Sequence, residues 1–235
     1  MPGIDDALEA VDRQYEDKRD PIAKKILEIA TQLEPFGILK VLKIIFSKEA
    51  STARFEALIQ QLILEVRRLD NAGRLLRDRV ESDGLKETII AALNEAARTV
   101  DVEKIKRFGV IVGSSLDSKR TWKSWDDAAT YIRDLAQLGD RDIQALQILY
   151  SVQKDLFLGK HLALDPNSYT EKNNEVLQLA DESGMPRDEF YSRCSRLNGF
   201  GLAIEVQRNE SRVSPGDHCF RITTRGRELV SIISG

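Results

Sequence analysis

The chain has 235 residues, of which 42% are hydrophobic and 31% charged, and its formal net charge at pH 7 is −3. This balance is typical of a globular protein and excludes an intrinsically disordered chain. Residues 141–235 carry 12 basic and 13 acidic side chains, and the preceding part carries 23 and 25. Neither part therefore has the positive excess that is typical of nucleic-acid binders.

The first segments predict helices interrupted by proline. Residues 5–19 have an apolar face, an Asp-Pro dipeptide follows, and apolar residues then recur at helical spacing over 22–33. Residues 36–46 form a dense apolar run whose charged residues are Lys40 and Lys43. We favour a core helix whose lysine heads extend to solvent. The alternative is a segment that lies in a membrane interface or docks into a partner.

The longest periodic signal predicts one long helix over residues 51–82. Its apolar residues alternate in steps of four and three, which is a heptad seam that packs against other helices or against a second copy of the chain. Gly73 is the weak point of this helix, and Gly84 is expected to end it. The seam consists of Phe55, Ile59, Leu62, Val66, Leu69, Gly73, Leu76 and Val80.

Helix signals continue to about residue 155. Asp101 suits the N-cap of one helix, and Ser124 opens a Ser-x-x-Asp capping box for the next. Gly139 suits the C-terminal cap of that second helix. The Gly-Val-Ile-Val-Gly run of residues 109–113 places two small residues four apart. It favours close packing of two helices over dimerisation in a membrane.

The pattern changes after about residue 158. Two helices are expected over 168–182 and 186–198, with a tight corner between them. Apolar and polar residues alternate over 202–207, which predicts a half-buried strand with Leu202, Ile204 and Val206 on its inner face.

A polar turn then leads to a second expected strand at 219–223, after which Thr223 can cap a last short helix. We therefore predict a mainly α fold. A helical bundle over 1–155 precedes a winged-helix-like α+β module over 156–235, and the module shares its first helix, 141–155, with the bundle.

Two sequence segments carry the resemblance to winged-helix domains. The sequence SRLNGFGL of residues 195–202 resembles the end of a recognition helix that enters the first wing strand. The sequence FRITTRGREL of residues 220–229 resembles the second wing strand and its Thr-capped terminal helix. The resemblance covers about residues 141–235. It implies that a DNA-binding member would contact DNA through Arg187, Ser192, Arg193, Ser195, Arg196, Arg208 and Arg212.

Acidic residues lie among these candidate contacts. Asp188, Glu189 and Glu210 offset the arginines, and affinity for DNA depends largely on neutralising phosphates. We favour an ion-paired or solvated face that contacts protein, with DNA binding as the alternative.

The middle of the chain is similar in spacing and order to the helical abortive-infection alpha family. The likeness extends over about residues 85–230. It includes Ala97 to Thr99, the IKRF sequence of residues 105–108, the helix of 125–135, Leu138-Gly139 and residues 143–149. Members of that family are linked to bacterial phage resistance and place a helical bundle before a winged-helix-like tail. The resemblance implies a role in phage defence without a defined mechanism.

Residues suited to catalysis or metal binding are few. His218 and Cys219 with Cys194 lack paired ligand spacing, and Ser114-Ser115 lacks the Gly-x-Ser-x-Gly elbow of hydrolases. No glycine-rich phosphate loop occurs in the sequence. We expect no catalytic, cofactor or metal site.

The chain begins without signal-peptide features, and no apolar stretch approaches the roughly 20 residues that span a bilayer. A cytoplasmic location is expected. The sequence predicts a non-enzymatic regulatory or protein-interaction protein that binds a protein partner or itself, with phage defence as its implied role. The alternatives are a DNA-binding winged-helix transcriptional regulator and a membrane-active effector that acts through residues 36–46.

Overall fold

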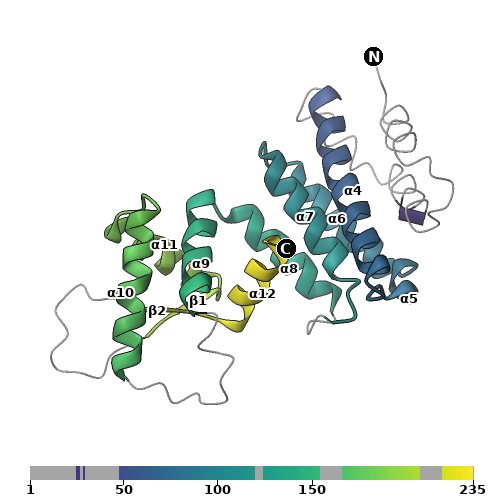
Figure 1. Cartoon of the computed structure of the whole chain (residues 1–235). Coiled ribbons are helices and arrows are strands. Elements are labelled where there is room, and N and C mark those ends of the chain that lie inside the picture. The colour runs from purple at the N-terminus through teal and green to yellow at the C-terminus, as the bar shows by residue number, and fades with distance from the viewer. Residues whose placement is uncertain are drawn as a thin grey trace. The chain divides into compact units, whose positions relative to one another are not determined.

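The computed structural model describes residues 25, 26, 29, 48–119, 124–153, 166–206 and 219–234. The chain divides into two compact units, residues 1–137 and 138–235. The described residues form helices and one two-stranded antiparallel sheet near the C-terminus (Figure 1). None of the described helices combines the length and the apolar character needed to cross a bilayer.

The described helices of the first unit are packed around α4. They are α4 (Lys48–Asn71), α5 (Arg77–Val80), α6 (Asp83–Ala96), α7 (Val102–Ser114) and α8 (Trp125–Gln137). Helix α4 contacts α6 and α7, and α6 and α7 both contact α8 (Figure 1). The five seam residues that lie on α4 are at most 1% exposed, which confirms their predicted burial: Phe55, Ile59, Leu62, Val66 and Leu69.

The prediction of a single helix over 51–82 was wrong at its C-terminal end. Helix α4 ends at Asn71, and Gly73 adopts the left-handed conformation with φ of 63°, which glycine reaches without steric cost. Residue Leu75 then forms an isolated antiparallel bridge with Asp117. Leu76 is half-buried and precedes α5, and Gly84 lies inside α6 instead of ending a helix.

Tertiary hydrogen bonds explain this break. The backbone N–H of Leu76 donates to the carbonyl of Leu116 at 2.9 Å, and the N–H of Ser118 donates to the carbonyl of Arg74 at 2.9 Å. The segment after Gly73 therefore pairs with the chain that leaves α7. A heptad pattern cannot reveal this contact because its partner lies about forty residues away in the sequence.

The glycines of the 109–113 run bring α7 close to α4, as predicted. A Cβ atom at Gly109 would lie 2.7 Å from the backbone oxygen of Leu58, and one at Gly113 would lie 2.5 Å from Cγ of Glu65. Real Cβ atoms do not approach other atoms so closely. Both positions therefore require glycine for the two helix backbones to meet at this distance.

The described helices of the second unit surround a central helix, α9. The elements are α9 (Asp140–Gln153), α10 (Pro166–Glu182), α11 (Arg187–Gly199), β1 (Ala203–Glu205), β2 (Phe220–Ile222) and α12 (Thr224–Ile233). Helix α9 contacts α10, α11, α12 and β2. The helix predicted to be shared between the two parts of the chain thus lies in the second unit.

The two strands form where the sequence predicts them, but the inner face of β1 differs from the prediction. Leu202 is buried, whereas Ile204 is 43% exposed and Val206 is half-buried. In the antiparallel register Ala203 lies opposite Ile222, and both are buried. The core-facing residue of β1 is therefore a small alanine, which an apolar alternation pattern does not distinguish from its larger neighbours.

Local signals at the helix ends were more accurate. The Asp101 carboxylate accepts from the backbone N–H groups of Glu103 and Lys104 in the first turn of α7. The Thr223 hydroxyl accepts from the N–H of Gly226 at 3.0 Å. Gly184 has a φ of 70° at the predicted corner before α11. Helix α10 begins at Pro166, two residues before the predicted Ser168.

Candidate interaction surface

Asp142 is the buried acid around which the charged surface of the second unit is arranged. It lies in the first turn of α9 and has no exposed surface. Its Oδ2 accepts a hydrogen bond from the backbone N–H of Gly139 at 2.7 Å, which satisfies one of the unpaired N–H groups at the start of the helix. A buried carboxylate also requires cationic partners, because its desolvation is costly.

Helix α11 supplies those partners. Nη1 of Arg193 lies 3.4 Å from Oδ1 of Asp142, and Nη1 of Arg196 lies 3.4 Å from Oδ2. The two arginines are three residues apart, so they share one face of the helix. Their side chains remain 32% and 47% exposed, which leaves part of each guanidinium group at the surface.

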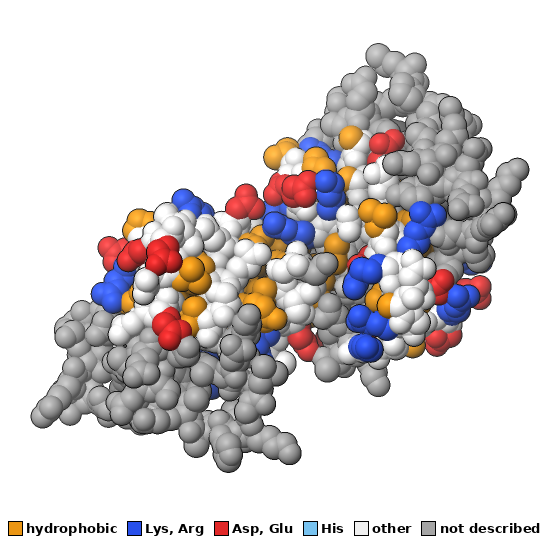
Figure 2. Space-filling model, viewed as in Figure 1, with side chains coloured by type: hydrophobic (Ala, Val, Ile, Leu, Met, Phe, Trp, Pro, Cys, Tyr) orange, Lys and Arg blue, Asp and Glu red, His pale blue; other side chains and the backbone are white. Residues whose placement is uncertain are grey.

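A second carboxylate extends this network at the surface. Oε1 of Glu189 lies 3.2 Å from Nη2 of Arg193 and 3.9 Å from Nε of Arg141. Together α9 and α11 contain four arginines and four carboxylates. The surface that they form is therefore balanced in formal charge. Figure 2 likewise shows acidic and basic side chains interspersed on the face in view.

The other predicted contact residues have different surroundings. The Arg187 guanidinium lies 5.9 Å from the centroid of the Tyr191 ring, in a cation–π contact. Ser192 and Ser195 are exposed on α11. The predicted wing residues Arg208 and Arg212 lie outside the described residues.

The burial of the polar side chains of Asp142 and Gln153 was not predicted from the sequence, although a signal was present. Both residues belong to the stripe Asp142, Leu146, Leu149 and Gln153, whose spacing places them on one face of α9. All four are buried. A polar residue on an otherwise apolar stripe indicates a buried partner. The identity of that partner depends on the tertiary fold.

The first unit contains a separate cluster of buried carboxylates between α4 and the end of α7. Oε1 and Oε2 of Glu65 accept hydrogen bonds from Arg68 at 2.6 and 2.8 Å. Asp117 is paired with Arg74 and accepts from the backbone N–H of Lys119 at 3.0 Å. Hydrogen bonding to Glu65 raises the pKa of the Arg68 guanidinium. Each carboxylate has an arginine partner. The Glu65–Arg68 pair lies within α4, and the Arg74–Asp117 pair joins the segments that follow α4 and α7.

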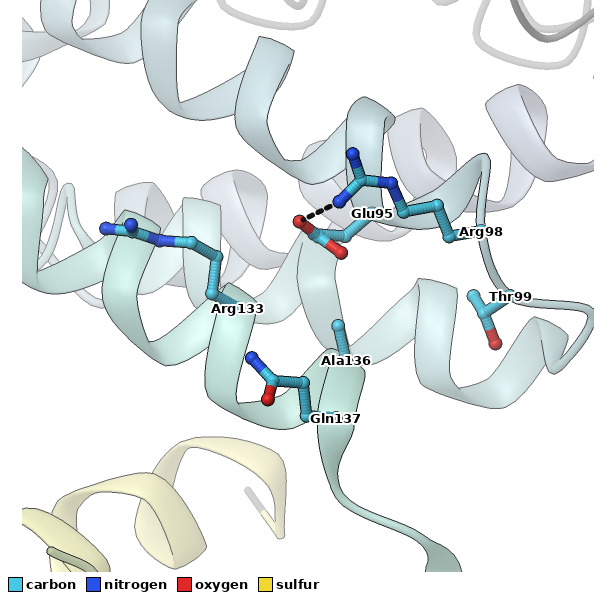
Figure 3. A pocket seen from close by; sticks show the side chains of 6 residues that line it. All are labelled: Glu95, Arg98, Thr99, Arg133, Ala136 and Gln137. Atoms are coloured by element: carbon cyan, nitrogen blue, oxygen red, sulfur yellow. Dashed lines mark hydrogen bonds and ion pairs between the residues drawn. The ribbon is translucent and has the colours of Figure 1, made fainter. Parts of the chain in front are cut away.

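An open pocket of about 430 Å³ lies between the C-terminal ends of α6 and α8. Arg98 and Glu95 form an ion pair at 3.3 Å on its rim, and Figure 3 shows Arg133 directed away from that pair. The Arg133 guanidinium instead donates to the carbonyl of Ala129 and the hydroxyl of Thr130. The charged groups of this pocket therefore do not converge on a common point.

Metal-binding groups of three or more His, Cys, Asp or Glu side chains are absent from the part of the chain that the structure describes. Cys194 and Cys219 are both buried, with reduced thiols. Burial raises the pKa of the Cys194 thiol. His161, His218 and the apolar run of residues 36–46 lie outside the described residues.

Comparison of the chain with protein-family models, with curated proteins and with solved structures finds no match.

Proposed function

We propose that this chain is a non-enzymatic regulatory protein whose C-terminal unit is a winged-helix-type module that contacts a partner protein through α11. Among the described residues of 140–233, the order of three helices, two antiparallel strands and a final helix supports the module assignment. The exposed side of α11 is the surface that such a module presents to its partner.

The charge balance of this surface is the observation that favours a protein partner over nucleic acid. Binding to nucleic acid depends on cations that are available to neutralise phosphates. Here Asp142 and Glu189 hold Arg193, and Asp142 also holds Arg196. A surface of balanced charge with exposed polar groups is instead compatible with the polar rim of a protein–protein interface.

Site-specific crosslinking in cells tests this proposal. A photoreactive phenylalanine analogue replaces Ser195 on α11 in one variant and Asn94 on α6 in the control, since both residues are exposed. The proposal predicts a discrete protein adduct at position 195 that is absent at position 94. An adduct that nuclease treatment removes would contradict it, and so would equal labelling at the two positions.

A DNA-binding regulator is the second candidate, and one observation favours it. Arg187, Ser192 and Ser195 are exposed on the helix that corresponds to the recognition helix of DNA-binding members. If this candidate is correct, the full chain retards genomic duplex DNA at low salt, and replacing Arg193 and Arg196 together by alanine abolishes the retardation. Absence of retardation at low salt would eliminate DNA binding.

The implied role in phage defence is an independent proposal. It rests on the resemblance of about residues 85–230, in spacing and order, to the abortive-infection alpha family. Plating efficiency of phages on cells with and without the chain tests it. A Leu62→Asp variant serves as control because Leu62 has no exposed surface and an unpaired charge there disrupts the first unit. Equal plating on both strains for a broad phage panel would contradict the proposal.

A further inference from the structure

Arg193 and Arg196 of α11 are both within ion-pairing distance of a carboxylate that comes from another helix. Asp142 is fully buried, and its two oxygens each face one of the two guanidinium groups at 3.4 Å. Guanidinium groups bind phosphate and carboxylate oxygens through the same charge-assisted donors. The Asp142 carboxylate therefore occupies the cationic groups that a nucleic-acid phosphate would use.

We propose that Asp142 is the specificity-determining residue of the α11 surface, and that its carboxylate excludes polyanions such as duplex nucleic acid in favour of a protein partner. This inference rests on the proposed function of α11 as a protein-contact surface. It attributes the discrimination between nucleic acid and protein to one buried residue, and not to net charge alone. A specific interface commonly includes such an element, which disfavours the wrong partner as well as favouring the right one.

The position of Asp142 distinguishes it from the surface acids. Asp188 is exposed on the first turn of α11, whereas Asp142 is held in place by the N–H of Gly139 at 2.7 Å. An exposed carboxylate moves aside or is screened by salt when a polyanion approaches. A buried carboxylate keeps its pairing with Arg193 and Arg196, because solvent and ions do not reach it.

The test compares two substitutions that change the net charge equally. Asp142→Asn removes the buried charge and keeps an oxygen that can accept from Gly139, while Asp188→Asn removes an exposed charge from the same surface. Binding of each full-length chain to a fluorescent random-sequence duplex is measured by anisotropy between 50 and 200 mM NaCl. Each additional phosphate contact weakens binding by a further factor of roughly three to four over this range.

The inference predicts measurable, salt-dependent duplex binding by Asp142→Asn, with a logarithmic salt slope about one to two contacts steeper than that of Asp188→Asn. Equal binding by the two variants would overturn it, because net charge would then explain the effect. Asp142→Ser, which also keeps an acceptor, replaces Asp142→Asn if the asparagine variant does not fold. Loss of folding in both would also overturn the inference, since Asp142 would then serve the fold alone.

A measurement of duplex binding by the wild-type chain distinguishes failure of this inference from failure of the proposed function. Duplex binding by the wild type at 50 mM NaCl would contradict the proposed protein-contact role of α11. Absence of duplex binding by the wild type, together with equal binding by the two variants, would contradict only the role of Asp142.

Discussion

The side-chain oxygen of Gln153 accepts a hydrogen bond from the backbone N–H of Ile222 at 2.9 Å. The side-chain nitrogen of the same glutamine donates to the carbonyl of Phe220, also at 2.9 Å. Strand β2 directs these two backbone groups away from β1, because β1 bonds the alternate residues of β2. One amide side chain from α9 thus pairs with the outer edge of β2 as a neighbouring strand would.

Replacing Gln153 is expected to destabilise the second unit. Gln153→Leu keeps the approximate size of the side chain but leaves one N–H and one carbonyl of β2 buried without partners. Each such group costs about 1–3 kcal/mol, so the two together are expected to lower the free energy of unfolding by about 2–6 kcal/mol. Urea denaturation of the full chain followed by circular dichroism measures this loss.

Gln147→Leu is the matched control, because Gln147 is exposed on the same helix and has only a 3.5 Å contact with the Ser234 hydroxyl. It is expected to change stability by less than about 0.5 kcal/mol. Equal stability of the two variants would show that Gln153 does not satisfy the β2 edge.

Gly109→Ala is expected to destabilise the first unit by about 1–3 kcal/mol, because the added methyl group would overlap the backbone oxygen of Leu58. Gly199→Ala is the control, since a Cβ atom there meets nothing within 4 Å and its φ is not positive. Thermal denaturation of both variants measures the difference. A Gly109→Ala protein as stable as the wild type would contradict the close approach of α7 to α4.

Glu56 provides a pH-dependent prediction. Partial burial raises the pKa of its carboxyl above the ordinary value of 4.5. The group therefore favours folding when protonated, and this contribution is lost as the pH rises through the folded-state pKa. Glu56→Gln is expected to be more stable than the wild type at pH 7, and the difference is expected to vanish below about pH 4. A difference that does not depend on pH would contradict this account.

Cys194 is expected to resist alkylation in the folded chain. The thiolate is the reactive form, and burial both hides the sulfur and raises the pKa of the thiol. Iodoacetamide at pH 8.5, followed by mass spectrometry of the Cys194 peptide, is expected to show slow labelling that becomes rapid in concentrated urea. Labelling at the same rate with and without urea would place Cys194 at the surface.

The accuracy of the sequence-based predictions depended on the range of the interactions involved. The N-caps at Asp101 and Thr223 and the corner at Gly184 were predicted because each depends on a few neighbouring residues. The break after Asn71 was missed because it depends on hydrogen bonds to residues 116–118. The heptad pattern continues past Asn71 and therefore gives no indication of the break.

The ion pairs of the candidate surface could be predicted only in general terms. The sequence indicated that acids offset the arginines of 187–196, and the structure shows Arg193 and Arg196 paired with Asp142. That acid comes from a helix about fifty residues earlier in the chain. The pairing depends on the way α9 crosses α11, which no local pattern specifies.

A double-mutant cycle between Asp142 and Arg193 tests most directly whether the α11 arginines are held by this buried acid. The free energies of unfolding of the wild type, Asp142→Asn, Arg193→Gln and the double variant are compared by urea denaturation. The account predicts a coupling free energy of about 1–3 kcal/mol, because removal of either partner leaves the other charge poorly compensated. Additive effects, with a coupling near zero, would contradict it.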